Sequence, residues 1–152
     1  MPERQLLPFS VGSEVYGLDI HEVREIIIPE QITRVPNMPD FLEGIIDLRG
    51  NVVPIVDMRK RFQSSRSHPV GRVLITDVNQ SSIGLRVDSM GRVIRIEERF
   101  FKPPPAMLTG MGAKFVRSVC ERPEAHGGGL ILMIDVAKLF SETELSALHS
   151  VH

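Results

Sequence analysis

Cysteine, tryptophan and tyrosine are nearly absent from this chain of 152 residues. Cys120 is the single cysteine, so no internal disulfide can form, which is typical of a reducing compartment. With one tyrosine and no tryptophan, the aromatic surface on which nucleic-acid bases stack is poorly supplied. The net charge of −1 also disfavours nucleic-acid binding driven by overall charge. The composition therefore argues against a disulfide scaffold and against a nucleic-acid partner.

Long hydrophobic runs are also missing. No apolar stretch approaches the roughly 20 residues needed to span a bilayer, and residues 1–5 lack the apolar centre of a signal peptide. We therefore expect a cytoplasmic protein without membrane insertion. Hydrophobic residues nevertheless make up 42% of the chain, which is enough to build a sizeable core.

The motifs of catalysis and metal binding are not found in the sequence. No two of the five histidines have metal-ligand spacing on one element, and Cys120 lacks a C-x-x-C partner. There is no glycine-rich phosphate loop and no nucleophile elbow. Asp19, Asp57, Asp88 and Asp135 lie at the ends of predicted strands, where helix capping or turn formation explains them better than acid–base chemistry. The sequence predicts no catalytic residue, no metal, no cofactor and no enzyme.

Residues 43–62 are the most informative stretch that is present. Two β-branched arms flank a turn at Leu48-Arg49-Gly50-Asn51, and the second arm ends in Asp57, which opens a short helix. A weaker copy of that last part occurs at residues 132–140, around Asp135. Gly17-Leu18 likewise recurs as Gly84-Leu85. These recurrences predict two related halves, although the shared composition of short β-rich segments is an alternative explanation.

The rest of the chain reads as short strands between turn residues, with few helical segments. We predict hairpins at residues 6–20, 72–87 and 114–134, a short strand at 31–35 and an exposed strand at 91–96. Helical turns are expected at 21–26 and 40–43, and a polar linker at 63–71. Ser141-Glu142-Thr143-Glu144 is a capping box that starts a C-terminal helix.

These elements define an all-β fold of two small five-stranded barrels, because closing a barrel removes exposed strand edges. The whole chain, 1–152, is expected to be one domain. Its approximate subdomains are 12–66 for one barrel, 67–140 for the other and 141–152 for the C-terminal helix, with the strand at 5–11 crossing between barrels. The basic cluster of Arg59, Lys60, Arg61 and Arg66 is interpreted as the solvated face of a short helix and its trailing loop.

Nearly the whole chain, from about residue 6 to 148, resembles the CheW family of bacterial chemotaxis coupling proteins. The resemblance is specific as an ensemble. It rests on Tyr16-Gly17-Leu18-Asp19-Ile20, Val23-x-Glu25-Ile26, Thr33-Arg34-Val35-Pro36, Phe41-Leu42-Glu43-Gly44, Asp47-Leu48-Arg49-Gly50 and Val53-Pro54-Ile55-Val56-Asp57-Met58-Arg59. Two features depart from the family pattern: Asp47 stands where asparagine is common, and the hairpin 119–130 is long.

The resemblance implies two SH3-like five-stranded β-barrels packed around a shared hydrophobic core. It also implies a non-catalytic adaptor that couples chemoreceptor cytoplasmic tips to the regulatory domain of a CheA-type histidine kinase, at membrane-associated receptor arrays. A CheW-like adaptor of a non-flagellar kinase pathway is one alternative. A double barrel that binds a small molecule or an oligonucleotide is another, for which the chain offers few aromatic residues.

Five residues match family positions implicated in receptor or kinase contacts: Val23, Glu25, Gly44, Arg49 and Val87. Each also has a structural interpretation. Arg49 could hold the carbonyl groups of its own turn, Gly44 could permit close backbone approach, and Val23 and Val87 could belong to the core.

Overall fold

The computed structural model describes residues 2–29, 32–62, 71–105 and 112–149. Strands dominate it, as the all-β prediction requires, and they form two sheets. Barrel A contains β1 (Glu3–Val11), β2 (Glu14–Asp19), β8 (Ser89–Met90), β9 (Ile94–Glu97), β10 (Phe101–Lys102), β11 (Val116–Glu121) and β12 (Leu130–Ile134). Barrel B contains β3 (Val23–Ile27), β4 (Leu42–Leu48), β5 (Asn51–Asp57), β6 (Arg72–Val78) and β7 (Ser81–Val87).

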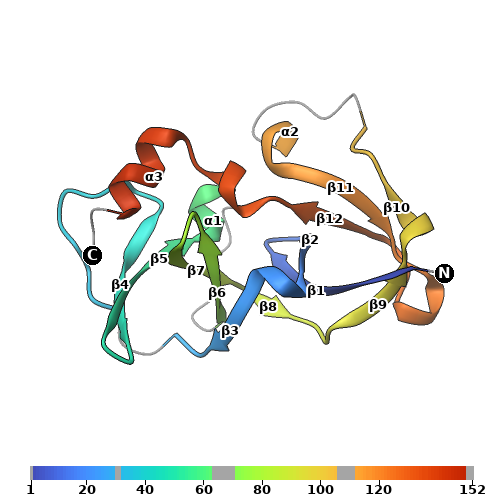
Figure 1. Cartoon of the computed structure of the whole chain (residues 1–152), viewed down its shortest axis with the longest axis horizontal. Helices are drawn as coiled ribbons and strands as arrows, with labels where there is room; N and C mark the ends of the chain where they lie inside the picture. Colours follow the sequence, from blue (N-terminus) through green and yellow to red (C-terminus); the bar gives the residue numbers. More distant parts are fainter. Residues whose placement is uncertain (1, 30–31, 63–70, 106–111, 150–152) are drawn as a thin grey trace.

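Short helices join and cover the two barrels, which lie side by side in Figure 1. The 3₁₀ turns are η1 (Ile20–Glu22), η2 (Glu98–Phe100), η3 (Glu124–His126) and η4 (Val136–Leu139). The α-helices are α1 (Met58–Arg61), α2 (Gly112–Phe115) and α3 (Glu142–His149). Helices α1, α2 and α3 all lie toward one side of the molecule, the upper side in Figure 1. No helix in the described ranges is long and apolar enough to cross a membrane.

The two halves of the chain exchange hairpins. The β1–β2 hairpin pairs with β12 through a parallel contact that sets Tyr16 against Leu132, so the beginning and the end of the chain build barrel A together. The β6–β7 hairpin pairs in the same way with β5 and therefore belongs to barrel B. The predicted subdomains 12–66 and 67–140 are thus wrong, because each half contributes its hairpin to the barrel that the other half completes.

The predicted internal repeat reappears in this arrangement. Gly17 on β2 lies beside Met133 on β12, and Gly84 on β7 lies beside Ile55 on β5. A Cβ atom on Gly17 would be 2.8 Å from the Met133 sulfur, and one on Gly84 would be 2.5 Å from Ile55 Cδ1. The repeated glycine therefore occupies equivalent places in the two barrels, where it lets a large neighbouring side chain fill the interior.

Apolar side chains form three clusters. One fills barrel A around Leu6 and Ile131, and a second fills barrel B around Ile55 and Val73. The third and largest lies between the barrels and takes residues from both sheets, together with Leu148 of α3. Strand alternation produces this division, since neighbouring residues such as Leu6 and Leu7 point into different clusters. The shared core expected from the resemblance is confirmed.

A buried ion pair marks one of the places where the chain passes between barrels. Asp88 follows β7 of barrel B and precedes β8 of barrel A; its side chain is 11% exposed and pairs with that of Arg59, which is 10% exposed. Asp88 also accepts a 2.8 Å hydrogen bond from the Gly12 N–H in the β1–β2 turn. Both Nη atoms of Arg59 are buried without a hydrogen-bond partner among the described residues. The predicted solvated face is therefore wrong for Arg59.

The same prediction fails for Arg61, which pairs with Glu144 through two contacts of 2.9 and 3.1 Å. Lys60 is exposed as predicted, and Arg66 lies outside the described residues, as does most of the linker predicted at 63–71. The capping predictions hold for three of four helix starts, including Asp19, which accepts from His21 N at 3.0 Å at the start of η1. Asp57 accepts from Arg59 N at 3.0 Å, and Ser141 and Glu144 form the reciprocal capping box, whereas Asp135 opens η4 without a side-chain cap.

Several local predictions are corrected. The helical turn predicted at 21–26 is shorter than expected: η1 covers Ile20–Glu22, and β3 follows from Val23 because the β6 edge offers backbone partners to this segment. Strand β4 begins at Leu42, inside the helical turn predicted at 40–43. Of the strand predicted at 31–35, the described part contributes an isolated bridge between Thr33 and Ile45. Strand β9 begins later than predicted and buries Ile96.

Candidate partner-binding surface

An ion pair brings two of the predicted site residues together at one end of barrel B. Glu25 projects from β3, and Arg49 lies in the two-residue turn between β4 and β5. The guanidinium meets the carboxylate through two hydrogen bonds, Nη1 to Oε1 at 2.9 Å and Nη2 to Oε2 at 2.5 Å. Two parallel donors on a planar carboxylate fix the orientation of both side chains. The structural alternative for Arg49 is that it binds carbonyl groups of its own turn. Its guanidinium instead binds the Glu25 carboxylate.

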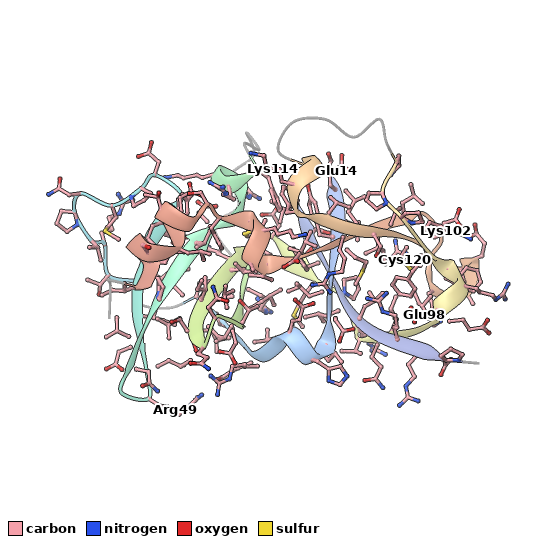
Figure 2. All side chains as sticks on the ribbon, turned by 45° about the horizontal axis from the view of Figure 1, so that its top comes forward. Glu14, Arg49, Glu98, Lys102, Lys114 and Cys120 are labelled. Carbon is pink, nitrogen blue, oxygen red and sulfur yellow. The ribbon has the colours of Figure 1, made fainter. Side chains whose placement is uncertain are left out.

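The turn itself explains why Arg49 stands out from the barrel. Arg49 and Gly50 have φ angles of +52° and +86°, which match the right-handed twist of the two strands that they connect. Asp47 Oδ1 accepts a 2.9 Å hydrogen bond from the Gly50 N–H and so braces the turn. The Arg49 side chain is 70% exposed and points away from the barrel at the lower edge of Figure 2.

The electrostatics follow from this contact. The hydrogen bond from Arg49 lowers the pKa of the Glu25 carboxyl, with the positive charge of Arg49 and Arg24 acting in the same direction. The same hydrogen bond raises the pKa of Arg49. At neutral pH the pair is fully ionised, so the surface presents a fixed guanidinium whose remaining donors face solvent.

Two hollows flank the ion pair and share Leu48 as a wall. The smaller, about 180 Å³, contains Glu25 and Arg49 themselves. The larger is an open groove of about 650 Å³ between β3 and β4, lined by Ile26, Ile27, Ile28, Thr33, Ile46, Asp47 and Leu48. Ile28 is 57% exposed and Ile26 is 36% exposed. We call this larger hollow the isoleucine groove.

The isoleucine groove was not predicted, although the sequence carries a signal for it. Ile26-Ile27-Ile28 is an uninterrupted apolar run at the end of edge strand β3, where alternation would place a polar residue on the outer face. Exposed apolar clusters beside fixed charges are typical of protein-binding surfaces. The arrangement is therefore suited to docking a partner that presents apolar side chains and a carboxylate or carbonyl group.

The other three predicted residues have different environments. Val23 is partly exposed and packs against the shared core, at a bulge in β3. Gly44 is buried, and a Cβ there would be 2.7 Å from Ile32 Cγ2 and closer still to the Thr33 carbonyl oxygen. Val87 is 2% exposed and belongs to the shared core. A partner cannot touch Gly44 or Val87 while the core is packed, so we do not retain them as contact residues.

The side chains of the described ranges offer neither a metal site nor an activated thiol. Those ranges contain no group of histidine, cysteine or acidic side chains able to hold a metal ion. Cys120 is fully buried, and burial raises the pKa of its thiol to about 11, which disfavours the reactive thiolate.

Fold and surface together define a two-barrel β protein with an exposed apolar groove beside an ion pair, and comparison with known proteins identifies its relatives. The model of the CheW-like domain matches residues 5–144. Similar proteins include the chemotaxis protein CheW of Treponema pallidum (strain Nichols), 33% identical over 95% of this chain and 86% of the relative. The CheW of Klebsiella aerogenes is 31% identical over 97% and 88%.

A solved structure agrees with these sequence matches. The scaffolding protein TtCheW from Thermoanaerobacter tengcongensis superposes with a TM-score of 0.83 at 33% identity, covering 95% of this chain and 96% of that one. This chain therefore belongs to the CheW-like family.

Proposed function

We propose that this protein is a non-catalytic coupling adaptor of bacterial chemotaxis, which joins chemoreceptors to a CheA-type histidine kinase. Its relatives are chemotaxis proteins named CheW, and the structural neighbour is described as a scaffolding protein. The adaptor acts in the cytoplasm, at receptor arrays that are themselves in the membrane. No observation favours the small-molecule or oligonucleotide alternative over this function.

The observation that carries the proposal is the isoleucine groove beside the Glu25–Arg49 pair. A receptor tip is a helical hairpin, and an amphipathic helix docks by laying its apolar side chains into a hydrophobic groove. Ile26 and Ile28 supply the apolar contact, and Arg49 supplies a charged donor at its edge. Val23 continues the same strand toward the other barrel. We therefore propose that the receptor tip binds along β3.

The proposal is tested by replacing one exposed isoleucine with a charge. Ile28→Lys places an ammonium group in the groove, so binding of a receptor cytoplasmic fragment should fall at least tenfold in a co-sedimentation assay. Val93→Lys is the matched control, because Val93 is 45% exposed but lies in the connection between β8 and β9 of barrel A. Equal receptor binding by both variants, or failure of the unmodified protein to sediment with receptor and kinase, would contradict the proposal.

A further inference from the structure

A third hollow lies on the opposite side of the molecule from the isoleucine groove. It has a volume of about 560 Å³ and is bounded by α1, α2, η4 and the start of α3. Its lining residues are Arg61, Lys114, Lys138, Leu139, Phe140, Ser141 and Glu144. In Figure 2, Lys114 lies at the upper edge and Arg49 at the lower edge. We call this hollow the cationic pocket.

The charge of the cationic pocket is not balanced by its own residues. It holds three cationic side chains and one carboxylate. That carboxylate, Glu144, is committed to Arg61 by two contacts and also accepts from the Ser141 N–H. Within the part of the chain that the structure describes, no acidic residue pairs with Lys114 or Lys138. The pocket therefore carries a net positive charge on a protein whose overall charge is −1.

The back of the pocket is rigid and partly apolar. Arg61 stacks against two phenylalanine rings, with its Cζ 5.1 Å from the Phe41 centroid and 5.6 Å from that of Phe140. Its side chain is 16% exposed, and its Nε is buried without a hydrogen-bond partner among the described residues. Leu139 and Phe140 belong to the shared core and anchor this wall to both barrels. A fixed wall of this kind lowers the entropic cost of binding.

We propose that the cationic pocket binds an acidic peptide segment of a second protein partner. A carboxylate-bearing segment would sit between Lys114 and Lys138, with an apolar side chain against Phe140. This inference rests on the proposed adaptor function, because an adaptor must hold two partners at once and so needs two surfaces that do not overlap. The α3 N-terminus is already satisfied by its capping box, so the attraction comes from the lysine side chains.

The test measures binding of a fluorescein-labelled peptide of alternating glutamate and leucine to the full chain by anisotropy. The double variant Lys114→Glu/Lys138→Glu should weaken binding at least tenfold, because it reverses two rim charges. Raising the salt concentration should weaken binding by the unmodified protein. Lys102→Glu is the matched control, an exposed lysine on β10 of barrel A that should leave the affinity unchanged.

Three outcomes would overturn the inference: equal loss of affinity in the Lys102→Glu variant, no loss in the double variant, or displacement of the peptide by millimolar inorganic phosphate, which would mark a small-anion site. A separate readout distinguishes this failure from failure of the proposed function. The double variant should bind receptor fragment normally, and Ile28→Lys should bind the acidic peptide normally. The reason is that the isoleucine groove and the cationic pocket lie on opposite sides of the molecule.

Discussion

At the scale of single residues, Arg49 combines a strained turn position with a bidentate partner. Its exposure of 70% means that the ion pair with Glu25 is screened by water and contributes little to folding. The pair instead fixes where the guanidinium points, so a docking partner meets a donor that is already oriented.

We therefore expect Arg49→Ala to reduce receptor-fragment affinity about 10- to 30-fold, as removal of an arginine anchor does at other interfaces. The urea midpoint should be nearly unchanged. Arg99→Ala is a suitable control, because Arg99 is 68% exposed and pairs with Glu97, next to β9 of barrel A and away from β3. Unaltered receptor affinity in a folded Arg49→Ala protein would exclude the interface role.

The titration of Glu25 provides an independent check of the same contact. Its pKa is lowered in the folded protein, so its favourable contribution is present above its ordinary pKa and is lost as pH falls through the lowered value. The side-chain carbon shift of Glu25, followed by NMR, should titrate below the usual glutamate range and return toward that range in Arg49→Ala. Identical titration of Glu25 in both proteins would show that the pair does not form in solution.

At the scale of elements, the strands and turns were largely predictable, because each depends on local patterns. Alternating β-branched runs marked the hairpins, and Asn79 and Gln80 adopt the positive φ angles that a two-residue turn needs. The segment at 21–26 failed because Val23, Ile26 and Ile27 fit a helical spacing as well as a strand. Pairing with β6 decided between them, and that partner lies far along the chain.

Local sequence patterns could not predict which strands pair, because the partners lie far apart along the chain. The sequence repeat placed Gly17 and Gly84 in equivalent positions, yet nothing in either half specifies that its hairpin joins the other barrel. The same gap affects Val87, which packs fully between the barrels. The motifs singled out Arg49 and Glu25 but not the ion pair between them, and the groove required the β3–β4 geometry.

Gly84 and Gly44 are buried where an added methyl group would meet close neighbours, and this leads to a prediction about packing. Gly84→Ala should destabilise the protein by about 1–3 kcal/mol, because the added methyl group overpacks against Ile55 and Val73. Gly44→Ala should cost more, since its methyl group would meet the Thr33 carbonyl, which is backbone and cannot rotate away. Urea unfolding of the two variants provides the comparison. A larger loss for Gly84→Ala than for Gly44→Ala would contradict this account.

At the scale of the whole molecule, the barrels are held together by the shared core and by the Arg59–Asp88 pair. A buried ion pair with unsatisfied donors costs desolvation energy, and removing one partner leaves the other charge uncompensated. Arg59→Met should therefore destabilise the protein by about 3–5 kcal/mol.

The double variant Arg59→Met/Asp88→Asn should lose less than the single variant. It removes both charges, and the asparagine oxygen can still accept from the Gly12 N–H. Free energies of unfolding from urea titrations complete the mutant cycle. Simple additivity of the two single changes would show that Arg59 and Asp88 are not energetically coupled.

The exchanged hairpins also constrain how this chain folds as it is synthesised. The β1–β2 hairpin is made first, but its parallel partner β12 is more than a hundred residues away and is made near the end. Contacts between such distant segments slow folding, because a long loop must close before they form. Until β12 emerges, the inner edge of the first hairpin is unpaired and its leucines are uncovered, which is the state that chaperones recognise and that aggregation exploits. All strands of barrel B lie between Val23 and Val87, so barrel B can close before barrel A during synthesis.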